Sequence, residues 1–391
     1  MNWEYKDLID VCEINLGKTP SRSNKKLWDI NKIGNNKWAS IADLTKVKGR
    51  YLSDTKEYIS DEGAKLFNYV KPNTILMSFK LSIGKLAITK EKIYTNEAIV
   101  ALPIKNNKEL NQDFLYYYLE FYDWEKESEN DVKVKGKTLN KDKLKKIKIP
   151  LPPFPIQQKI VEKLDTIFVE IDKATAAIEA NVKNAEALFK NYLKKTYKGD
   201  KNWKIVTLRD VSKVIAGQSP KGTNYNKEGK GLPFYQGKKD FGDRYINIPT
   251  VWTTEITKEA IKEDILISVR APVGPVNIAN EHICIGRGLA AIRTTDKINK
   301  EYLFNYFLKI EKELVSNVGA VFNSINKTQI ENLKIPLPNL TIQQDIVSKI
   351  NKISSEVNKL NNLHKNKLSD LVFFKQSILK QAFNGELVKA A

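Results

Sequence analysis

Residues 148–164 read KIPLPPFPIQQKIVEKL, and residues 334–350 read KIPLPNLTIQQDIVSKI. The two stretches lie 186 residues apart and are identical at 11 of their 17 positions. Similarity over so long an interval indicates an internal repeat, in which one structural unit is used twice. We therefore expect a chain built from two copies of one unit, with this stretch marking the same place in each copy.

Three further pairs of segments match between the two halves of the chain, at offsets of 200, 190 and 188. They are residues 3–20 and 203–220, residues 74–80 and 264–270, and residues 113–119 and 301–307. The first pair predicts a short helical turn followed by a glycine-led turn, the second a strand and the third a helix. The changing offset places insertions and deletions in the loops between them.

A long helix is predicted after each copy of the repeated stretch. The prolines at 150, 152, 153 and 155 exclude a helix interior and favour an extended backbone before the first helix. From Ile156 the apolar residues recur every three or four positions, as in a coiled-coil seam with one stutter. Gly199 and Gly385 follow the two helices as C′ glycines. The predicted seam positions are Ile160, Leu164, Ile167, Ile171, Ala174, Ile178, Val182, Ala185, Phe189 and Tyr192, then Ile346, Ile350, Ile353, Val357, Leu360, Leu368, Leu371 and Ile378.

Two narrow seams of matched length predict that the helices pair antiparallel. At a rise of ~1.5 Å per residue, each helix of about 40 residues would make a spacer of ~60 Å. The predicted fold class is α+β: two globular domains of mixed α/β structure, separated by two long antiparallel coiled-coil helices and related by an internal pseudo-two-fold repeat. The predicted boundaries are 1–150 and 200–336 for the globular domains, and 151–199 and 337–391 for the spacer helices.

The charge of the chain predicts a polyanionic partner. Lysine and arginine number 65 against 46 acidic residues, which gives a net charge of +19. Nucleic acid is the commonest partner of such a chain. A membrane surface is the alternative, but no basic amphipathic anchor is visible. Only seven of the basic residues are arginine and asparagine is abundant, which is typical of an AT-rich genome, so each arginine carries more information than a lysine.

Other classes of protein are disfavoured by composition. The N-terminus lacks an apolar signal core, and no run approaches the ~20 apolar residues of a membrane helix, so we expect a cytoplasmic protein. Two cysteines exclude a disulfide framework or a cysteine-rich zinc site. The two histidines, His282 and His364, argue against a histidine-based metal or catalytic site, and we expect His364 at the edge of the helix seam.

The whole chain resembles the specificity subunit of type I restriction-modification enzymes. The resemblance is carried by the two copies of the repeated stretch, which lie at the places the family requires. It is supported by residues 17–20 (GKTP), by Gly286-Arg287-Gly288 and by the ending KQSILKQAFNGE at residues 375–386. The departures are mild: Asn339 replaces Pro153, and a Gln-Gln pair stands where the family usually has a Glu-Gln or similar pair.

This resemblance implies a function. Each globular segment would be a target recognition domain that binds one half of a split, asymmetric DNA target. The helices would set the distance between the half-sites and dock two modification (methyltransferase) subunits, to which restriction subunits are added. The chain itself would be non-catalytic and bind no cofactor, because S-adenosylmethionine belongs to the methyltransferase subunit and ATP and Mg to the restriction subunit. Two rigidly spaced basic modules independently suit half-sites one DNA turn apart, ~34–36 Å.

The residues predicted to contact DNA lie in loops after the glycine-proline turns, where basic side chains alternate with Tyr and Gln. A solvated basic surface is the alternative for any one of them. The set is Arg22, Lys25, Lys26, Lys46, Lys48, Arg50, Tyr51 and Lys80 in the first domain, and Lys221, Tyr225, Lys227, Tyr235, Gln236, Lys238, Lys239, Arg244, Arg270 and Arg287 in the second. Four glutamines recur at equivalent places near the helix starts: Gln157, Gln158, Gln343 and Gln344. They are candidates for binding the methyltransferase subunits, and capping of the helix start is the open alternative.

No enzymatic motif in the sequence is complete. Leu151-Pro152-Pro153-Phe154 resembles the Pro-Pro-aromatic motif of amino-methyltransferases, but Leu cannot bind the target amine. Gly286-Arg287-Gly288 is too short for a nucleotide-binding loop. Glu228-Gly229-Lys230 resembles a nuclease tripeptide without its partner residues. A fused methyltransferase-nuclease is therefore disfavoured, and a coiled-coil scaffold that binds other proteins remains the alternative to a DNA specificity subunit.

Overall fold

The structure is a computed structural model that describes residues 3–128, 132–133, 136–317 and 324–388. The chain forms two compact units. Unit 1 consists of Met1–Ala177 and Lys367–Ala391, and unit 2 of Ile178–Asn366. Each unit therefore combines one globular part with a portion of both long helices, α7 (Phe154–Thr196) and α10 (Leu340–Phe383).

The globular part of unit 1 is built on a mixed sheet with strand order β2-β9-β6-β7-β4. A smaller sheet has the order β5-β3-β8, and β1 pairs with β12. The strands are β1 (Glu4–Asp7), β2 (Asn15–Leu16), β3 (Lys37–Ala39), β4 (Tyr51–Leu52), β5 (Glu57–Tyr58), β6 (Ile75–Ser78), β7 (Leu86–Thr89), β8 (Tyr94–Thr95), β9 (Ile99–Leu102), β10 (Val132–Lys133), β11 (Gly136–Lys137) and β12 (Lys148–Leu151). The helices before α7 are α1 (Leu8–Val11), η1 (Lys25–Leu27), α2 (Ile41–Thr45), α3 (Asp61–Ala64), α4 (Gln112–Phe121), α5 (Trp124–Glu127) and α6 (Lys141–Lys145).

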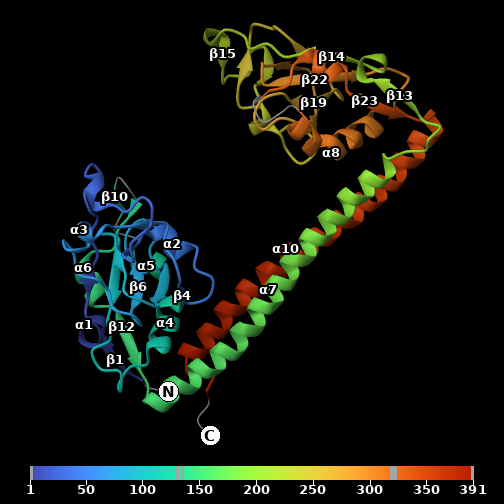
Figure 1. Ribbon diagram of the computed structural model, residues 1–391. Coiled ribbons are helices and arrows are strands. Elements are labelled where there is room, and N and C mark those ends of the chain that lie inside the picture. The colour runs from blue at the N-terminus through green and yellow to red at the C-terminus, as the bar shows by residue number, and fades with distance from the viewer. Residues whose placement is uncertain (1–2, 129–131, 134–135, 318–323, 389–391) are drawn as a thin grey trace. The chain divides into compact units, whose positions relative to one another are not determined.

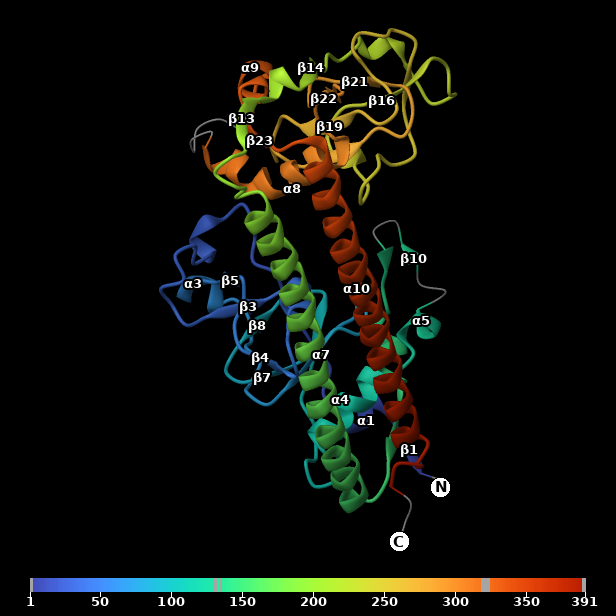
Figure 2. The same ribbon diagram turned by 90° about the vertical axis from the view of Figure 1, so that its right-hand side faces the viewer.

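Unit 2 repeats this plan. Its sheets have the strand orders β14-β22-β19-β20 and β15-β17-β16-β21-β18. β13 pairs with β23, and the two strands lie side by side in Figure 2. The strands are β13 (Lys204–Thr207), β14 (Ser212–Ala216), β15 (Tyr225–Asn226), β16 (Leu232–Tyr235), β17 (Trp252–Thr253), β18 (Glu259–Ala260), β19 (Ile265–Ser268), β20 (Val276–Ile278), β21 (Ile283–Ile285), β22 (Leu289–Thr294) and β23 (Lys334–Leu337). The helices before α10 are η2 (Leu208–Asp210), η3 (Gly222–Asn224), η4 (Lys238–Asp240), α8 (Lys300–Asn317) and α9 (Lys327–Glu331).

The repeated stretch forms a strand followed at once by a long helix. In unit 1, β12 contains Pro150 and pairs antiparallel with β1, and α7 begins at Phe154. In unit 2, β23 makes the same pairing with β13 before α10 begins at Leu340. The predicted extended segment is confirmed, as are the strands at β6 and β19 and the helices α4 and α8. Gly199 and Gly385 have φ angles of 75° and 78°, the left-handed conformation that a C′ glycine adopts.

The long helices pack inside each unit along the predicted seam. In unit 1, the early part of α7 shares a core with the late part of α10, through Ile160, Leu164, Ile171 and Ile378. Figure 1 shows these two helix segments side by side. In unit 2, the seam residues Phe189 and Tyr192 near the end of α7 pack against the core that contains Ile346 and Ile350 of α10. The helices are therefore antiparallel, as predicted. The prediction of Leu360 as a seam residue is wrong: it is 40% exposed, and the buried seam position next to it is His364.

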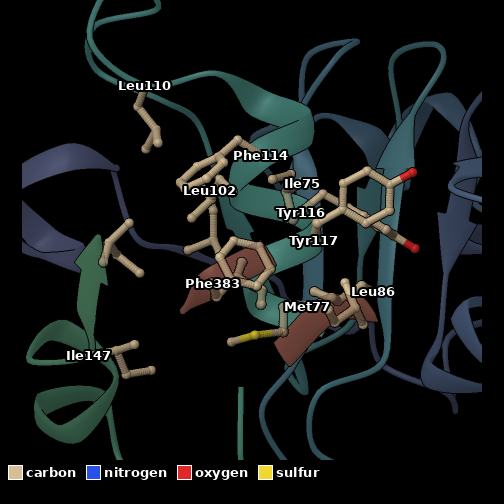
Figure 3. Close-up of a cluster of buried hydrophobic side chains, with 14 of the residues drawn as sticks. Ile75, Met77, Leu86, Leu102, Leu110, Phe114, Tyr116, Tyr117, Ile147 and Phe383 are labelled. Carbon is tan, nitrogen blue, oxygen red and sulfur yellow. The ribbon is translucent and has the colours of Figure 1, made fainter. Parts of the chain in front are cut away.

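Each long helix also packs against the globular part of its unit, which fixes that part to the helix pair. Phe383 of α10 lies among Phe114, Met77 and neighbouring side chains of the first globular part (Figure 3). Its ring lies 5.4 Å from the ring of Phe114, centroid to centroid. In unit 2, Tyr197 donates a hydrogen bond to the Tyr302 carbonyl at 2.6 Å. Among the described residues, no helix is long and apolar enough to cross a membrane.

Candidate nucleic-acid interface

A tightly held turn lies between β21 and β22 of unit 2. The Gly286 amide donates to the Tyr235 carbonyl at 2.8 Å, and the Gly288 carbonyl accepts from the Val269 amide at 3.0 Å. A Cβ at Gly288 would come within 2.2 Å of the Gln236 carbonyl oxygen, so only glycine fits this close approach of two backbones. The turn therefore holds the backbone of Arg287 in place while its side chain remains exposed.

Five of the residues predicted to bind DNA meet around this turn. A cavity of about 510 Å³ is lined by Gln236, Lys238, Lys239, Arg270 and Arg287, together with Gly237, Ser268, Ala271, Pro272 and Gly288. Gln236 follows β16, Lys238 and Lys239 lie in η4, Arg270 follows β19, and Arg287 lies in the β21–β22 turn, so the five side chains come from segments far apart in sequence. None of the described residues that line this cavity is acidic, so it is a concentrated positive surface of unit 2 that suits a phosphate backbone and base edges.

In unit 1, the predicted residues gather in two places. Arg22 and Lys25 line a cavity of about 310 Å³, whereas Lys46, Lys48 and Tyr51 line another of about 540 Å³. Lys26 is exposed beside the first of these, on η1. Both cavities also carry carboxylates, including Glu57 in the first. These two cavities of unit 1 are therefore mixed in charge, whereas the charged residues described around the cavity of unit 2 are all basic.

Three of the predicted arginines are held by partners within their own unit. Arg22 makes a bidentate ion pair with Glu57, with Nη2···Oε2 at 3.0 Å, and its guanidinium lies 3.9 Å from the ring centroid of Trp28. The side chains of this ion pair are partly exposed to solvent. The hydrogen bond to Glu57 raises the pKa of Arg22. Arg22 is thus a cation in a fixed orientation at the surface.

Arg50 is held between the globular part and α7. Its Nη1 lies 3.1 Å from Asp113 Oδ1 of α4 and 3.0 Å from Asp165 Oδ1 of α7. Burial alone would lower the pKa of its guanidinium, but the neighbouring Tyr117 hydroxyl and the two carboxylates outweigh burial, so the pKa is raised. Arg50 therefore serves as an internal ion pair rather than as a free surface cation.

Arg244 of unit 2 is likewise held by an ion pair, here to a helix of the globular part. It donates to Glu301 of α8, and its guanidinium lies 4.9 Å from the ring centroid of Phe304. Asp113 and Glu301 are equivalent residues, because each lies in the first turn of α4 or α8, the helices related by the offset of 188. The two arginines, in contrast, come from different places in the repeat.

The remaining predicted residues vary in exposure. Tyr235 is 2% exposed and its hydroxyl donates to the Asn247 carbonyl at 2.8 Å, so its side chain belongs to the core and the prediction of a DNA contact is corrected. Tyr225 is half-buried, and its ring stacks on Phe234 with the centroids 4.8 Å apart. Lys80 is half-buried over the Phe79 ring, whereas Lys221 and Lys227 are exposed.

The glutamine pairs divide into buried and exposed members. Gln157 and Gln343 are fully buried. The Gln157 side chain accepts from the Asn111 amide at 2.8 Å and donates to the Pro152 carbonyl at 2.9 Å. Gln343 makes the same two bonds in unit 2, with Asn299 and Pro338. These two side chains brace the helix start, so the alternative of capping fits them, and their full burial argues against the predicted contact with the methyltransferase subunits. Gln158 and Gln344 are exposed.

The residue of unit 1 that corresponds to Arg287 is absent from the set that the sequence predicts. Glu97 lies in the β8–β9 turn of unit 1, at the same offset of 190 that relates β6 to β19. That offset pairs it with Arg287, and this correspondence was the available signal. A search for basic residues alone could not find it.

The architecture defines a class of protein before any relative is considered. Two copies of one α/β unit, each joined to part of a helix pair, form a repeat protein that holds two binding surfaces. Within the described residues, no group of three or more His, Cys, Asp or Glu side chains could hold a metal ion.

The chain belongs to the family described as type I restriction modification DNA specificity domain, whose model matches residues 1–184 and again 200–369. It is 34% identical over 382 residues to a putative type I restriction enzyme specificity subunit, MjaX, of Methanocaldococcus jannaschii, covering 90% of this chain and 87% of the relative. It is 23% identical over 383 residues to the EcoBI specificity subunit of Escherichia coli, covering 88% and 80% of the two chains.

Solved structures agree with this assignment. A chain from a structural study of complex assembly and conformational transition of the type I R-M system has a TM-score of 0.79 at 28% identity, with 98% of both chains covered. The HsdS subunit from Thermoanaerobacter tengcongensis has a TM-score of 0.54 at 26% identity, with 98% of this chain and 97% of the other covered. The predicted resemblance, fold class and role as a DNA specificity subunit are confirmed.

Proposed function

We propose that unit 1 and unit 2 each bind one half of a split, asymmetric DNA target, and that the helix pair sets the distance between the two half-sites. The observation that carries this proposal is the basic cavity of unit 2, where Gln236, Lys238, Lys239, Arg270 and Arg287 meet. Lysine supplies attraction to phosphates, and arginine and glutamine supply hydrogen bonds to base edges. Because the two units carry different side chains on their surfaces, the two half-sites are expected to differ.

In this proposal the chain is not an enzyme and binds no cofactor. It directs two modification subunits that bring S-adenosylmethionine, and restriction subunits that bring ATP and Mg join this core. DNA as the target places its work in the cytoplasm. The absence of a methyltransferase motif in the sequence and the membership in a specificity family support this division of labour.

The outer faces of the long helices would dock the modification subunits. Val372, Phe373 and Phe374 of α10 follow one another and are 59%, 66% and 49% exposed. A cluster of large apolar side chains at a surface is typical of a protein–protein interface. It replaces the buried glutamines as the contact that we expect, and Gln158 and Gln344 remain candidates beside it.

A salt titration of DNA binding tests the proposed interface. Removing one phosphate-binding side chain should reduce the slope of log K against log salt by about 0.9. In the chain assembled with its modification subunit, the double variant Lys238→Ala with Lys239→Ala should lower the slope by about 2. The matched control is Lys258→Ala with Lys262→Ala, which removes the same charge from exposed sites of unit 2 outside the cavity. Equal reductions in both double variants would reject the cavity as the interface.

A further inference from the structure

The β8–β9 turn of unit 1 and the β21–β22 turn of unit 2 share one backbone frame. Four backbone hydrogen bonds recur with the same geometry, each joining residues that correspond between the units. In unit 1, the bonds run from the amide of Gly17 to the carbonyl of Ile99 (3.0 Å), from Asn96 to Ala39 (3.0 Å), from Phe79 to Ala98 (3.0 Å) and from Ile99 to Asn96 (3.2 Å). In unit 2, the corresponding bonds run, in the same order, from Gly217 to Leu289 (2.9 Å), from Gly286 to Tyr235 (2.8 Å), from Val269 to Gly288 (3.0 Å) and from Leu289 to Gly286 (3.0 Å). The central residues of the turns, Glu97 and Arg287, are therefore structural equivalents.

These two residues have opposite charges in turns that share these four hydrogen bonds. Both side chains are exposed. The Thr19 hydroxyl donates to the Glu97 carboxylate, whereas the corresponding hydroxyl of Ser219 accepts from the Arg287 backbone amide at 3.2 Å. Among the described residues, no hydrogen bond or ion pair engages the Arg287 guanidinium, which leaves its five donors for a partner.

The charge of Glu97 argues against a role in binding the DNA backbone. Burial raises its pKa, but the Thr19 hydrogen bond and the cations Lys80 and Arg22 outweigh burial, so the net pKa is lowered. Glu97 is therefore an anion at neutral pH, and its carboxylate can only accept hydrogen bonds. A phosphate would repel it, whereas an amino group on a base edge would satisfy it. Arg287, beside Arg270 in the basic cavity, suits the two acceptors of guanine.

We propose that Glu97 and Arg287 are equivalent specificity-determining residues, Glu97 selecting a base with an exocyclic amino donor in one half-site and Arg287 selecting a guanine in the other. This inference rests on the proposed function, because it requires each unit to bind its own half-site. It adds that one turn in each repeat contacts a base, and that the side chain at its centre decides which base is accepted.

The test is methyl transfer by the complete modification complex on a panel of DNA duplexes. Sequencing of the methylated genome first gives the bipartite motif of the wild-type chain. Each base pair of both half-sites is then replaced in turn, and the discrimination ratio is measured for the wild type, Glu97→Ala, Arg287→Ala and Arg287→Lys. Lys262→Ala serves as the control for the loss of one exposed charge.

The expected result is a local loss of discrimination. Glu97→Ala should reduce it about tenfold or more at one position of one half-site, and Arg287→Ala should do the same at one guanine of the other half-site. Arg287→Lys keeps the charge but loses the planar fork, so it should also lose discrimination. Because both side chains are exposed, these variants should fold, and unchanged circular dichroism verifies that.

Two results would overturn the inference while leaving the proposed function intact. One is unchanged discrimination at every position. The other is an equal loss of activity on all duplexes with a reduced salt slope, which is the behaviour of a phosphate contact. If the wild-type complex methylates no bipartite motif, the proposed function fails and this inference fails with it.

Discussion

Replacing Arg50 by methionine is expected to destabilise unit 1 by about 2 kcal/mol. Arg50 lies between Asp113 of α4 and Asp165 of α7, and so connects the globular part to the long helix. Arg50 Nη1 and Asp113 Oδ1 make no aligned hydrogen bond among the described side chains, so that contact is mainly electrostatic. Methionine keeps most of the side-chain length but leaves two carboxylates facing each other.

The magnitude follows from how far the three groups are exposed. Breaking a buried ion pair by removing one partner costs about 3–5 kcal/mol, because the other charge is left uncompensated. The side chains of Arg50, Asp113 and Asp165 are 21%, 31% and 38% exposed, so water screens part of that charge. We therefore reduce the cost by roughly half. For a unit of this size the midpoint of thermal unfolding should fall by about 5 °C.

The assay is thermal and urea unfolding of the full chain, with hydrogen exchange of α4 and α7 to assign the change to unit 1. The control is Lys173→Met, which breaks the exposed ion pair with Glu170 on the same helix and should cost about 0.5 kcal/mol or less. In the triple variant Arg50→Met, Asp113→Asn, Asp165→Asn, most of the original stability should return, because no charge is left unpaired. If Arg50→Met costs no more than the control, the ion pair does not stabilise this contact.

The effect should also depend on pH. Burial and the neighbouring Asp165 raise the pKa of Asp113 above its ordinary value of 3.8, and Arg50 opposes them. The charged carboxylate therefore costs stability above its folded-state pKa, and protonation relieves that cost as the pH falls through it. Without Arg50 the pKa of Asp113 rises further. The difference between the variant and the wild type should be largest at neutral pH and should shrink on acidification.

Four further predictions concern single side chains. Gln157→Ala should destabilise unit 1 by about 2 kcal/mol in urea unfolding, because it leaves buried backbone groups unpaired. It should leave the affinity for the modification subunit unchanged, and the exposed Gln158→Ala is its control. Phe373→Ser should instead weaken that affinity, measured by calorimetry, without loss of stability, with the exposed Lys367→Ser as the control. Gly288→Ala should slow methylation, since its Cβ meets the Gln236 carbonyl oxygen at 2.2 Å, whereas Gly222→Ala, with open space around its Cβ, should not. Asn351→Asp should change the stability of unit 2 in thermal unfolding by no more than about 0.5 kcal/mol, because Arg244 in the cavity that Asn351 lines is already paired with Glu301; a larger rise would contradict this.

Most of the fold was predictable because the repeat is strong in the parts that build the core. The heptad pattern identified Ile160, Leu164 and Ile171 as seam positions, and they are buried. The pattern did not identify Phe168 and Leu193, which are buried against the globular parts. A helix with two packing partners has two buried faces, and the periodicity of one seam describes only one of them. Leu360 was assigned to the seam wrongly for a different reason. A stutter in the apolar repeat shifts the buried face of α10, so that His364 is buried and Leu360 is exposed.

The candidate interface was predictable only as a set of residues. Composition and loop position found the side chains around the cavity of unit 2, but not that Gln236, Arg270 and Arg287 meet there. They also gave Tyr235 and Arg244 the same weight as Arg287, although the first is buried and the second is ion-paired. Whether a polar side chain faces solvent or its own unit depends on contacts between distant segments, and local sequence does not contain them.

The two units keep the same side chain where folding requires it and differ where the side chain is exposed. Gln157 and Gln343 are identical because each satisfies buried backbone groups, and no other side chain of that length supplies both a donor and an acceptor. At the turn, backbone hydrogen bonds hold the frame, so the exposed side chain at its centre contributes little to folding. Glu97 and Arg287 could therefore diverge to opposite charges without loss of the fold. If these turns contact bases, as we propose, the specificity of the two half-sites can differ within one repeated architecture.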